Sequence, residues 1–508
     1  MSRKFKISWF IIAFLFGLLV NELNLYFVRK ENPGNIPLNE KSTMHGYTIY
    51  NVDHEWYLPQ IKHMMAGHGY TLEPHNPEMK VRRTPLYPLW YGLHYVLFGE
   101  EKSFFVIRYS QLLLFSLAAI LLGMAVFNFS LDERWAKWAT ALFSLSPFIF
   151  IYAYHTITEG LTPFLVVLPF YFFSRFHVSG NRKFLLLAGI ATGLAMLNRP
   201  LTGLLLPAFL LSLLRKDLFR GPVFKELALQ SLFLALPAIL TLAPWTVRNY
   251  FATRGEIVLL EKIYYEDPMD FGRGHFYFRN WISGWANPAT VSAEQFSNAL
   301  RDNIRLGRTD NDSIIDQFIT TLPAYSGEKN RVRSALNSLN DCFAEKERLR
   351  LADPHITRKQ LAGLECEEKA KRQWEELISD FKRESPLRYH LLTPLLMIKE
   401  GIFQSNSLFY GSLNPAGRDF SLPQKLIKGC MYLLNLMLFI SAFAFIFSPA
   451  TGNNLKIMIL SFLFLTLFSL TYVFFRYLDA RYLLPLYPFL YISMSYFIAL
   501  FLRRLKRE

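Results

Sequence analysis

The run FFVIRYSQLLLFSLAAILLGMAVFNF, from Phe104 to Phe129, decides the class of fold because it is long and almost entirely apolar. A helix needs about 20 mostly apolar residues to cross the hydrocarbon core of a bilayer. Similar runs precede and follow this one, and together they predict an all-α polytopic membrane protein with about ten transmembrane helices. The predicted spans are Ile7–Val28, Phe104–Phe129, Ala136–Ala153, Ile157–Phe173, Phe184–Leu197, Leu201–Leu214, Leu227–Trp245, Leu426–Phe447, Leu455–Phe475 and Tyr482–Leu502.

The composition agrees with this class. Of the 508 residues, 52% are hydrophobic and only 19% are charged, whereas about a quarter of the residues in soluble domains are charged. The formal net charge is +15, which in a soluble protein would suggest nucleic acid. Here basic clusters flank the apolar runs, as at both chain ends, and this favours anionic membrane lipids as partners and cytoplasmic termini.

Two polar segments interrupt the membrane pattern and set the predicted organisation. We expect the first transmembrane helix at 1–28, a periplasmic loop with interfacial helices at 29–103, helices two to seven at 104–247, a periplasmic, mainly helical region at 248–424, and helices eight to ten with a basic cytoplasmic tail at 425–508. In the larger polar region Thr357 with Gln360 predicts a capping box that opens a helix to about Arg383. Cys342 and Cys366 lie in the same region, either as a disulfide or as two inert thiols.

The first loop carries an unusual concentration of charged and aromatic residues. Its sequence includes NVDHEWYLPQIKHMMAGHGY at 51–70 and VRRTPLYPLWYGL at 81–93. Asp53 and Glu55 are candidate catalytic acids there, and Arg83 is a candidate anion ligand. Tyr57 and Tyr87 are candidates for stacking on a substrate, although interfacial aromatic belts are the commoner origin of such residues.

The predicted topology places further ionisable groups at the same outer level: Glu159, Arg199, Arg248 and Arg481. Arg199 lies at the tip between two short apolar runs, each of roughly 22 Å as a helix, in a hydrocarbon core of about 30 Å. A charge at that depth usually faces a cavity or a partner. Glu159 has an alternative role as a helix N-terminal acid, and Arg248 as a side chain that snorkels to the interface.

This set of residues fits one kind of chemistry. The planar fork of arginine binds phosphate in a bidentate manner, and a nearby carboxylate can act as general base on a hydroxyl. Together they suit attack of an acceptor hydroxyl on a sugar whose leaving group is a lipid phosphate. No P-loop motif and no tight His/Cys cluster is present, so no nucleotide and no cofactor are expected, and a divalent metal has no support beyond His155 with Glu159.

These motifs resemble the GT-C integral-membrane glycosyltransferases, in particular bacterial relatives of the protein O-mannosyltransferases (glycosyltransferase family 39) and of the lipid A aminoarabinose transferase. The positions that match the family's first-loop pattern are Asp53, Tyr57, Gly67, Gly69, Arg83, Pro85, Tyr87 and Pro88, with Thr84 inserted. Four later runs, TEGL at 158–161, GLAMLNRP at 193–200, PWTVRNY at 244–250 and RYLLPLYP at 481–488, resemble further family runs in the same order.

The resemblance implies a GT-C fold and a catalytic aspartate at Asp53. It also implies transfer of a hexose or pentose from a polyprenyl-phosphate donor, on the periplasmic face of a cell inner membrane. Two departures matter: His54 follows the aspartate where the mannosyltransferases have an acid, and 256–425 has no counterpart. The acceptor, whether glycan, lipid or protein, is therefore open. A transporter or flippase of an anionic lipid-linked sugar is the alternative, although no internal repeat of the kind found in transporters is visible.

Overall fold

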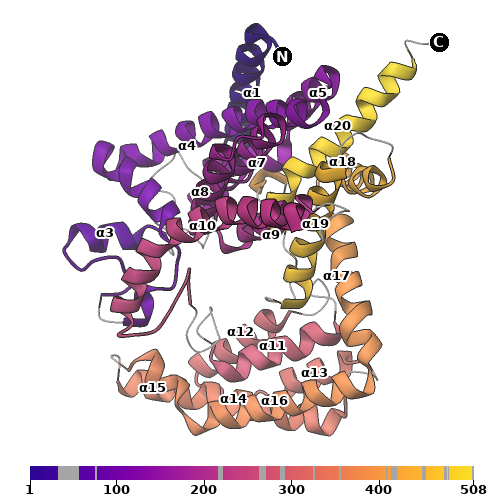
Figure 1. Ribbon diagram of the computed structural model, residues 1–508. Coiled ribbons are helices and arrows are strands. Elements are labelled where there is room, and N and C mark those ends of the chain that lie inside the picture. The colour runs from indigo at the N-terminus through magenta and orange to yellow at the C-terminus, as the bar shows by residue number, and fades with distance from the viewer. Residues whose placement is uncertain are drawn as a thin grey trace. The chain divides into compact units, whose positions relative to one another are not determined.

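The structure is a computed structural model, and it describes residues 1–31, 57–74, 77–214, 221–262, 271–286, 292–323, 327–353, 356–407, 410–413, 420–448, 453–473, 478 and 480–505. Within these ranges the regular elements are helices and no strand is present. The chain forms two compact units (Figure 1). Unit 1 comprises 1–261, 402–466 and 479–508, and unit 2 comprises 262–401 and 467–478. The predicted all-α class is confirmed.

Unit 1 contains the long apolar helices. Its α-helices are α1 (Arg3–Glu31), α3 (Pro59–Met65), α4 (Leu86–Ser130), α5 (Glu133–Ser144), α6 (Pro147–Phe150), α7 (Thr162–Ser179), α8 (Lys183–Asn198), α9 (Leu205–Ser212), α10 (Gly221–Ala252), α18 (Leu422–Ile446), most of α19 (Asn453–Phe468) and α20 (Tyr487–Arg504). Short 3-10 turns join them: η2 (Pro77–Lys80), η3 (Ile151–Tyr154), η4 (Thr158–Gly160), η5 (Pro200–Leu204), η9 (Gly411–Leu413) and η11 (Ala480–Leu486).

Six described helices are long and apolar enough to cross a membrane, or seven if the bent pair α5 with 147–154 forms one span. They are Arg3–Val28, Lys102–Ser130, Phe224–Ala252, Leu422–Ile446, Asn454–Tyr472 and Arg481–Arg504. The predicted run Phe104–Phe129 lies inside the second of these. The count of ten stays a prediction, because α8 and the helical segment Pro200–Ser212 are apolar but short. Exposed leucines along α10 and α18 are the surface that lipid chains would cover.

Close packing of α8 against α10 depends on two glycines one turn apart. α8 lies beside both α7 and α10 (Figure 1). A Cβ atom at Gly189 would lie 2.3 Å from the Leu234 carbonyl oxygen, and one at Gly193 would lie 2.8 Å from the Ala238 carbonyl oxygen. Small residues at this four-residue spacing let membrane helices approach until their backbones touch. The contact fixes the C-terminal end of α8, where Arg199 follows.

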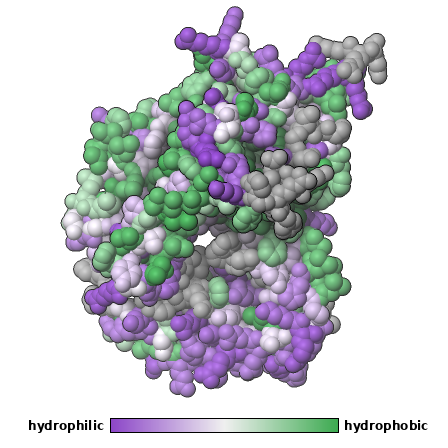
Figure 2. Space-filling model, viewed as in Figure 1, coloured by the Kyte–Doolittle hydropathy of each residue, from purple (hydrophilic) through white to green (hydrophobic). Residues whose placement is uncertain are grey.

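Unit 2 is a smaller helical body with its own core. Its helices are α11 (Arg273–Trp285), α12 (Ala293–Arg305), α13 (Asp312–Thr321), α14 (Lys329–Ala352), α15 (Arg358–Ala362), α16 (Glu365–Glu384), a π-helical turn η8 (Arg388–Leu392), most of α17 (Thr393–Ile402) and η10 (Ser469–Val473). Phe278, Trp281 and Trp374 are fully buried at its centre. Hydrophilic residues dominate the face of this unit seen in Figure 2, so that face is suited to contact with water.

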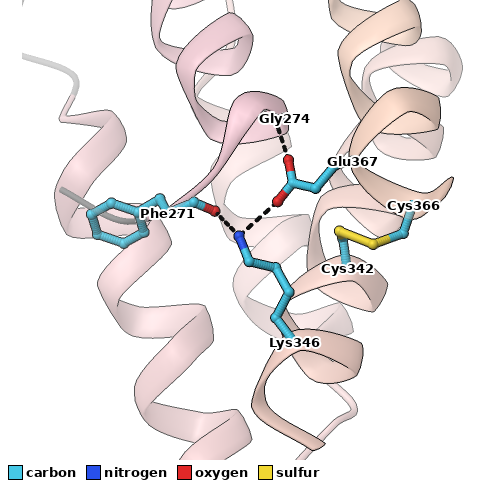
Figure 3. The surroundings of a disulfide bond; sticks show 6 residues. All are labelled: Phe271, Gly274, Cys342, Lys346, Cys366 and Glu367. Atoms are coloured by element: carbon cyan, nitrogen blue, oxygen red, sulfur yellow. Dashed lines mark hydrogen bonds and ion pairs between the residues drawn. A yellow bond between two sulfur atoms is a disulfide. The ribbon is translucent and has the colours of Figure 1, made fainter. Parts of the chain in front are cut away.

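A disulfide and a buried ion pair tie α14 to α16 and to the start of α11 (Figure 3). Cys342 is bonded to Cys366. One turn away the Lys346 ammonium lies 2.6 Å from a Glu367 oxygen and donates to the Phe271 carbonyl oxygen. The other Glu367 oxygen accepts from the Gly274 backbone N–H at 2.7 Å. Of the two states left open for these cysteines, the disulfide is the one that forms.

Two local predictions have different outcomes. The capping box of Thr357 with Gln360 is confirmed, with both reciprocal hydrogen bonds present. The predicted helix to Arg383 is wrong as a single helix, because α15 ends at Ala362 and α16 begins at Glu365. The break falls at Gly363 and Leu364, where glycine does not favour continuation of a helix.

Candidate functional site

The centre of the candidate site is an ion pair between Glu159 and Arg199. An Nη atom of Arg199 lies 2.6 Å from a Glu159 carboxylate oxygen, and both side chains are buried, with 9% and 4% of their surface exposed. The Thr158 hydroxyl donates to the other carboxylate oxygen at 3.1 Å. A buried charge persists only when it is paired and hydrogen-bonded. The sequence separation of 40 residues shows that tertiary folding makes this pair.

The local sequence explains why both residues leave the helices. Glu159 lies in the 3-10 turn η4, directly before α7, which has proline at its start. Arg199 caps the C-terminus of α8 in an extended conformation, with φ −151° and ψ 113°, because the residue before a proline is driven out of the helical region. Both side chains therefore project from the adjoining ends of the packed helices α7 and α8.

Asn198 and Thr84 join the first loop to this helix end. The Asn198 amide donates to the Thr158 carbonyl oxygen at 3.0 Å and to the Thr162 hydroxyl at 3.1 Å. The Thr84 hydroxyl donates to the Asn198 carbonyl oxygen at 3.1 Å. Thr84 is the residue inserted relative to the family pattern, and here it links the loop to the tip that carries Arg199.

Arg83, Tyr57 and Tyr87 form the loop side of the site. The guanidinium carbon of Arg83 lies 5.6 Å from the centre of the Tyr57 ring, a cation–π arrangement. The Tyr57 and Tyr87 rings are also 5.6 Å apart, edge to face, and the Tyr87 hydroxyl donates to the Gln111 side-chain oxygen at 3.1 Å. Burial raises the pKa of Tyr57 and of Tyr87 above their usual value, so both hydroxyls keep their protons at neutral pH.

Arg481 approaches the same cluster through Tyr482. The guanidinium of Arg199 lies 5.0 Å from the centre of the Tyr482 ring, and that of Arg481 lies 5.1 Å from it. Three of the four predicted anion ligands, Arg83, Arg199 and Arg481, thus gather around two tyrosine rings. Neighbouring guanidinium groups repel one another, and an anion or a carboxylate close to them offsets this repulsion.

Arg248 occupies a different position. Its guanidinium donates to the Lys80 carbonyl oxygen at 2.5 Å and to the Tyr70 carbonyl oxygen, and it stacks on Trp245 and Tyr70. The Tyr70 hydroxyl in turn donates to the carbonyl oxygens of Arg83 and Thr84. Arg248 therefore holds the first loop against α10, and its role as a phosphate ligand stays a prediction.

Sequence reasoning missed an acid of this site, Glu261. The pKa of its carboxyl is raised by burial, and the opposing charge of Arg83 is the largest of the influences that lower it. Arg199, Arg82 and the backbone of Thr84 act in the same direction and lower the pKa of the Glu261 carboxyl. The only signal in the sequence was the short apolar run 257–260 that follows Gly255 and leads to this acid, which indicates a segment packed against the protein.

The two acids predicted to be catalytic in the first loop, Asp53 and Glu55, lie outside the described residues. Tyr57, four positions after Asp53, is the first described residue after Glu31. Within the described ranges no group of three or more His, Cys, Asp or Glu side chains is arranged to hold a metal ion.

The comparisons with known proteins bear on the same part of the chain. Residues 82–245 match the family described as dolichyl-phosphate-mannose-protein mannosyltransferase. The resemblance expected from the sequence is confirmed over this range, which includes Arg83, Tyr87, Glu159 and Arg199. No curated protein sequence matches the chain significantly.

Among solved structures, the chain is similar to the archaeal oligosaccharyltransferase AglB from Archaeoglobus fulgidus, solved in complex with an inhibitory peptide and a dolichol-phosphate. The identity is 13% and the TM-score is 0.43, with 97% of this chain and 50% of AglB covered. The chain thus spans about half the length of that protein, and the similarity is too low to carry an argument about substrate.

Proposed function

We propose that the protein is a membrane glycosyltransferase that moves one sugar, a hexose or a pentose, from a polyprenyl-phosphate donor to an acceptor on the periplasmic face of a cell inner membrane. The observation that carries the proposal is the gathering of Arg83, Arg199 and Arg481 around Tyr57 and Tyr482, with the buried Glu159 beside Arg199. Converging guanidiniums in a buried setting suit a phosphate that gains negative charge as it leaves.

The reaction assigns a task to each group. An acceptor hydroxyl attacks the anomeric carbon, its proton passes to Asp53, and the bond from that carbon to the phosphate oxygen breaks. The electron pair stays on the phosphate, which the arginines hold. Glu159 fixes the direction of Arg199, and Tyr57 and Tyr87 offer protonated hydroxyls and ring faces to the sugar. Glu55 is a second acid in the same loop as Asp53.

The disulfide supports the assignment of unit 2 to the periplasmic side. Disulfides persist in oxidising compartments and are rare in the cytosol, and Cys342–Cys366 lies in unit 2. Unit 2 is also the part without an aligned counterpart in the resemblance, so we assign to it the choice of acceptor, a glycan, a lipid or a protein.

The test is transfer of a labelled sugar from polyprenyl phosphate in proteoliposomes, comparing the wild type with Asp53→Asn. We expect transfer by the wild type and at least a 10²-fold lower kcat for the variant, because an amide cannot accept the proton. Equal turnover by both proteins would refute the role of Asp53. Movement of the intact labelled lipid across the bilayer, without cleavage of the sugar–phosphate bond, would instead support a flippase.

A further inference from the structure

The segment that follows α17 is anchored to the middle of α18. The Asn435 amide donates to the Ile402 carbonyl oxygen at 2.8 Å and to the Gln404 carbonyl oxygen at 3.2 Å. The Asn406 amide donates to the Asn435 side-chain oxygen at 3.1 Å and to the Tyr487 hydroxyl. All five residues belong to unit 1. Asn435 therefore binds irregular backbone at the point where α17 ends.

The position of Asn435 along α18 sets the depth of this contact. α18 is a candidate membrane span of 25 residues, Leu422–Ile446. Asn435 lies about 20 Å from its first residue and about 16 Å from its last, at 1.5 Å per residue. A hydrocarbon core of about 30 Å placed on this helix leaves Asn435 at least about 10 Å from either surface. A membrane crossed by α18 therefore encloses the end of α17.

The chain returns from this depth to the N-terminal end of α18. The Ser412 carbonyl oxygen accepts from the Gln424 amide at 2.8 Å, in the first turn of α18. The Ser412 hydroxyl and backbone N–H both donate to the side-chain oxygen of Asn24 in α1. From Asn435 back to Gln424 the helix covers about 16 Å, and the chain from Asn406 to Ser412 can span up to about 20 Å. The return is therefore short and direct.

The exposed face of α17 is apolar at this level. Met397 is buried, whereas Leu395 and Leu396 are roughly half exposed, as is Phe403 just after the helix. Leu396 comes six residues before Ile402, about 9 Å along the helix, so it lies within the same layer. Exposed leucine and phenylalanine side chains at such a depth match lipid acyl chains, as do the exposed leucines of α18.

We infer that residues 393–413 form a re-entrant hairpin whose outward face contacts the acyl chains of membrane lipids. α17 enters the hydrocarbon layer, and the rest of the segment returns to the surface where α18 begins. A helix of ten residues covers about 15 Å, half of the hydrocarbon core, so α17 reaches this depth without crossing. The polar amide of Asn435 is stable inside a span because it satisfies the backbone of the hairpin.

This inference is independent of the proposed sugar transfer and changes the predicted organisation. The sequence predicted that the whole region 248–424 lies outside the membrane. The hydrogen bonds of Asn435 place part of it, the end of α17 and the residues that follow, beside the middle of a candidate span.

The test uses single cysteines at exposed leucines, in a protein with Cys430→Ser and the native disulfide kept. Leu396→Cys probes the hairpin, Leu433→Cys is the lipid-facing control on α18, and Leu351→Cys is the control on unit 2. A charged maleimide is added to the full chain in lipid nanodiscs. We expect Leu396→Cys and Leu433→Cys to react at least about tenfold more slowly than Leu351→Cys, because hydrocarbon excludes both the reagent and the thiolate.

A neutral bimane attached at position 396 identifies what covers it. We expect nitroxide groups on lipid acyl chains to quench its fluorescence as strongly as that of bimane at position 433. Reaction of Leu396→Cys as fast as Leu351→Cys would overturn the inference, because the surface would then face water. Slow reaction without quenching would overturn it too, because a second copy of the chain would then cover this face.

The return to the same surface is tested in right-side-out vesicles from cells that express the protein. The charged maleimide should label Leu351→Cys and Leu422→Cys, at the start of α18, from the same side. Labelling of only one of them would mean that the segment crosses the membrane, which excludes a hairpin.

The anchor is tested by Asn435→Leu in the Leu396→Cys protein. Loss of two donors to the hairpin backbone should raise the labelling rate about tenfold. Asn128→Leu is the matched control, since its amide donates to the Ser174 hydroxyl elsewhere in unit 1, and it should change nothing. Equal rates in the two variants would contradict the role of Asn435. If Asn435→Leu does not fold, Asn406→Ala is compared with Asn128→Leu instead.

Discussion

At the scale of single residues, the ability of Arg199 to bind an anion beside Glu159 depends on the shape of its guanidinium group. Both side chains are buried and share one short ion pair. The guanidinium of Arg199 also lies 5.0 Å from the centre of the Tyr482 ring. A lysine there would keep the charge but lose the fork.

Arg199→Lys is therefore expected to lower kcat/KM about 10²-fold, the typical cost of removing one preorganised donor to a developing anion. The check is sugar transfer in proteoliposomes. Arg182→Lys is the matched control, because Arg182 forms an ion pair of similar length with Glu226, at 2.7 Å, but on the exposed surface. Full activity of Arg199→Lys would show that only the positive charge is required.

Glu159→Gln tests the same pair through stability. The substitution leaves Arg199 as a buried charge without its carboxylate, so we expect unfolding to become easier by about 3–5 kcal/mol. Thermal unfolding in detergent measures the change. Glu226→Gln, which breaks the exposed pair with Arg182, should cost no more than about 1 kcal/mol. Equal melting temperatures for the two variants would contradict the assignment of Glu159 as a buried partner.

At the scale of helices, the contact of α8 with α10 sets where the tip with Arg199 lies. Gly189 and Gly193 allow the two backbones to approach until carbonyl oxygens of α10 occupy the space of a Cβ atom. This contact depends on the absence of side chains at the two glycines. At its C-terminus α8 ends at Asn198, which forms hydrogen bonds with both the first loop and η4.

Gly189→Ala should destabilise unit 1 by about 1–3 kcal/mol, the usual cost of overpacking, because a Cβ would lie 2.3 Å from the Leu234 carbonyl oxygen. Gly429→Ala in α18 is the control, since no heavy atom lies within 4 Å of its Cβ position. That change should be neutral or slightly stabilising, because alanine favours a helix over glycine. The melting temperatures of both variants in the same detergent measure the change in stability, and equal values would contradict the prediction.

At the scale of the whole molecule, the chain combines a membrane unit with a helical unit that has a separate core. Unit 2 contains the described disulfide, Cys342–Cys366, whose cysteines are 24 residues apart. Closing a loop of this size restricts the unfolded chain and stabilises the folded one by about 3 kcal/mol.

Replacing Cys342 and Cys366 together by serine should lower the stability of unit 2 by about 3 kcal/mol. Limited proteolysis over 262–401 in rising denaturant measures the effect, and dithiothreitol should reproduce it in the wild type. Cys430→Ser, at a free cysteine in unit 1, should change nothing. Resistance of the double variant equal to that of the wild type would mean that the disulfide does not hold this unit.

Much of the fold was predictable from the sequence because the signal is local. An apolar run such as Phe104–Phe129 must hydrogen-bond its own backbone in lipid, so it forms a helix wherever it lies. The capping box at Thr357 is equally local. The break after Ala362 was missed because a single glycine in a charged, helix-favouring stretch is a weak signal.

The sequence by itself determined the class of the protein, the helical character of its apolar runs and the residue types available for binding a phosphate. Only the tertiary structure decided which of them meet. It paired Glu159 with Arg199 and turned the Arg248 guanidinium toward the backbone of the first loop. The physical reason is that apolar periodicity acts over one turn of helix, whereas the partner of a buried charge is set by how distant segments pack.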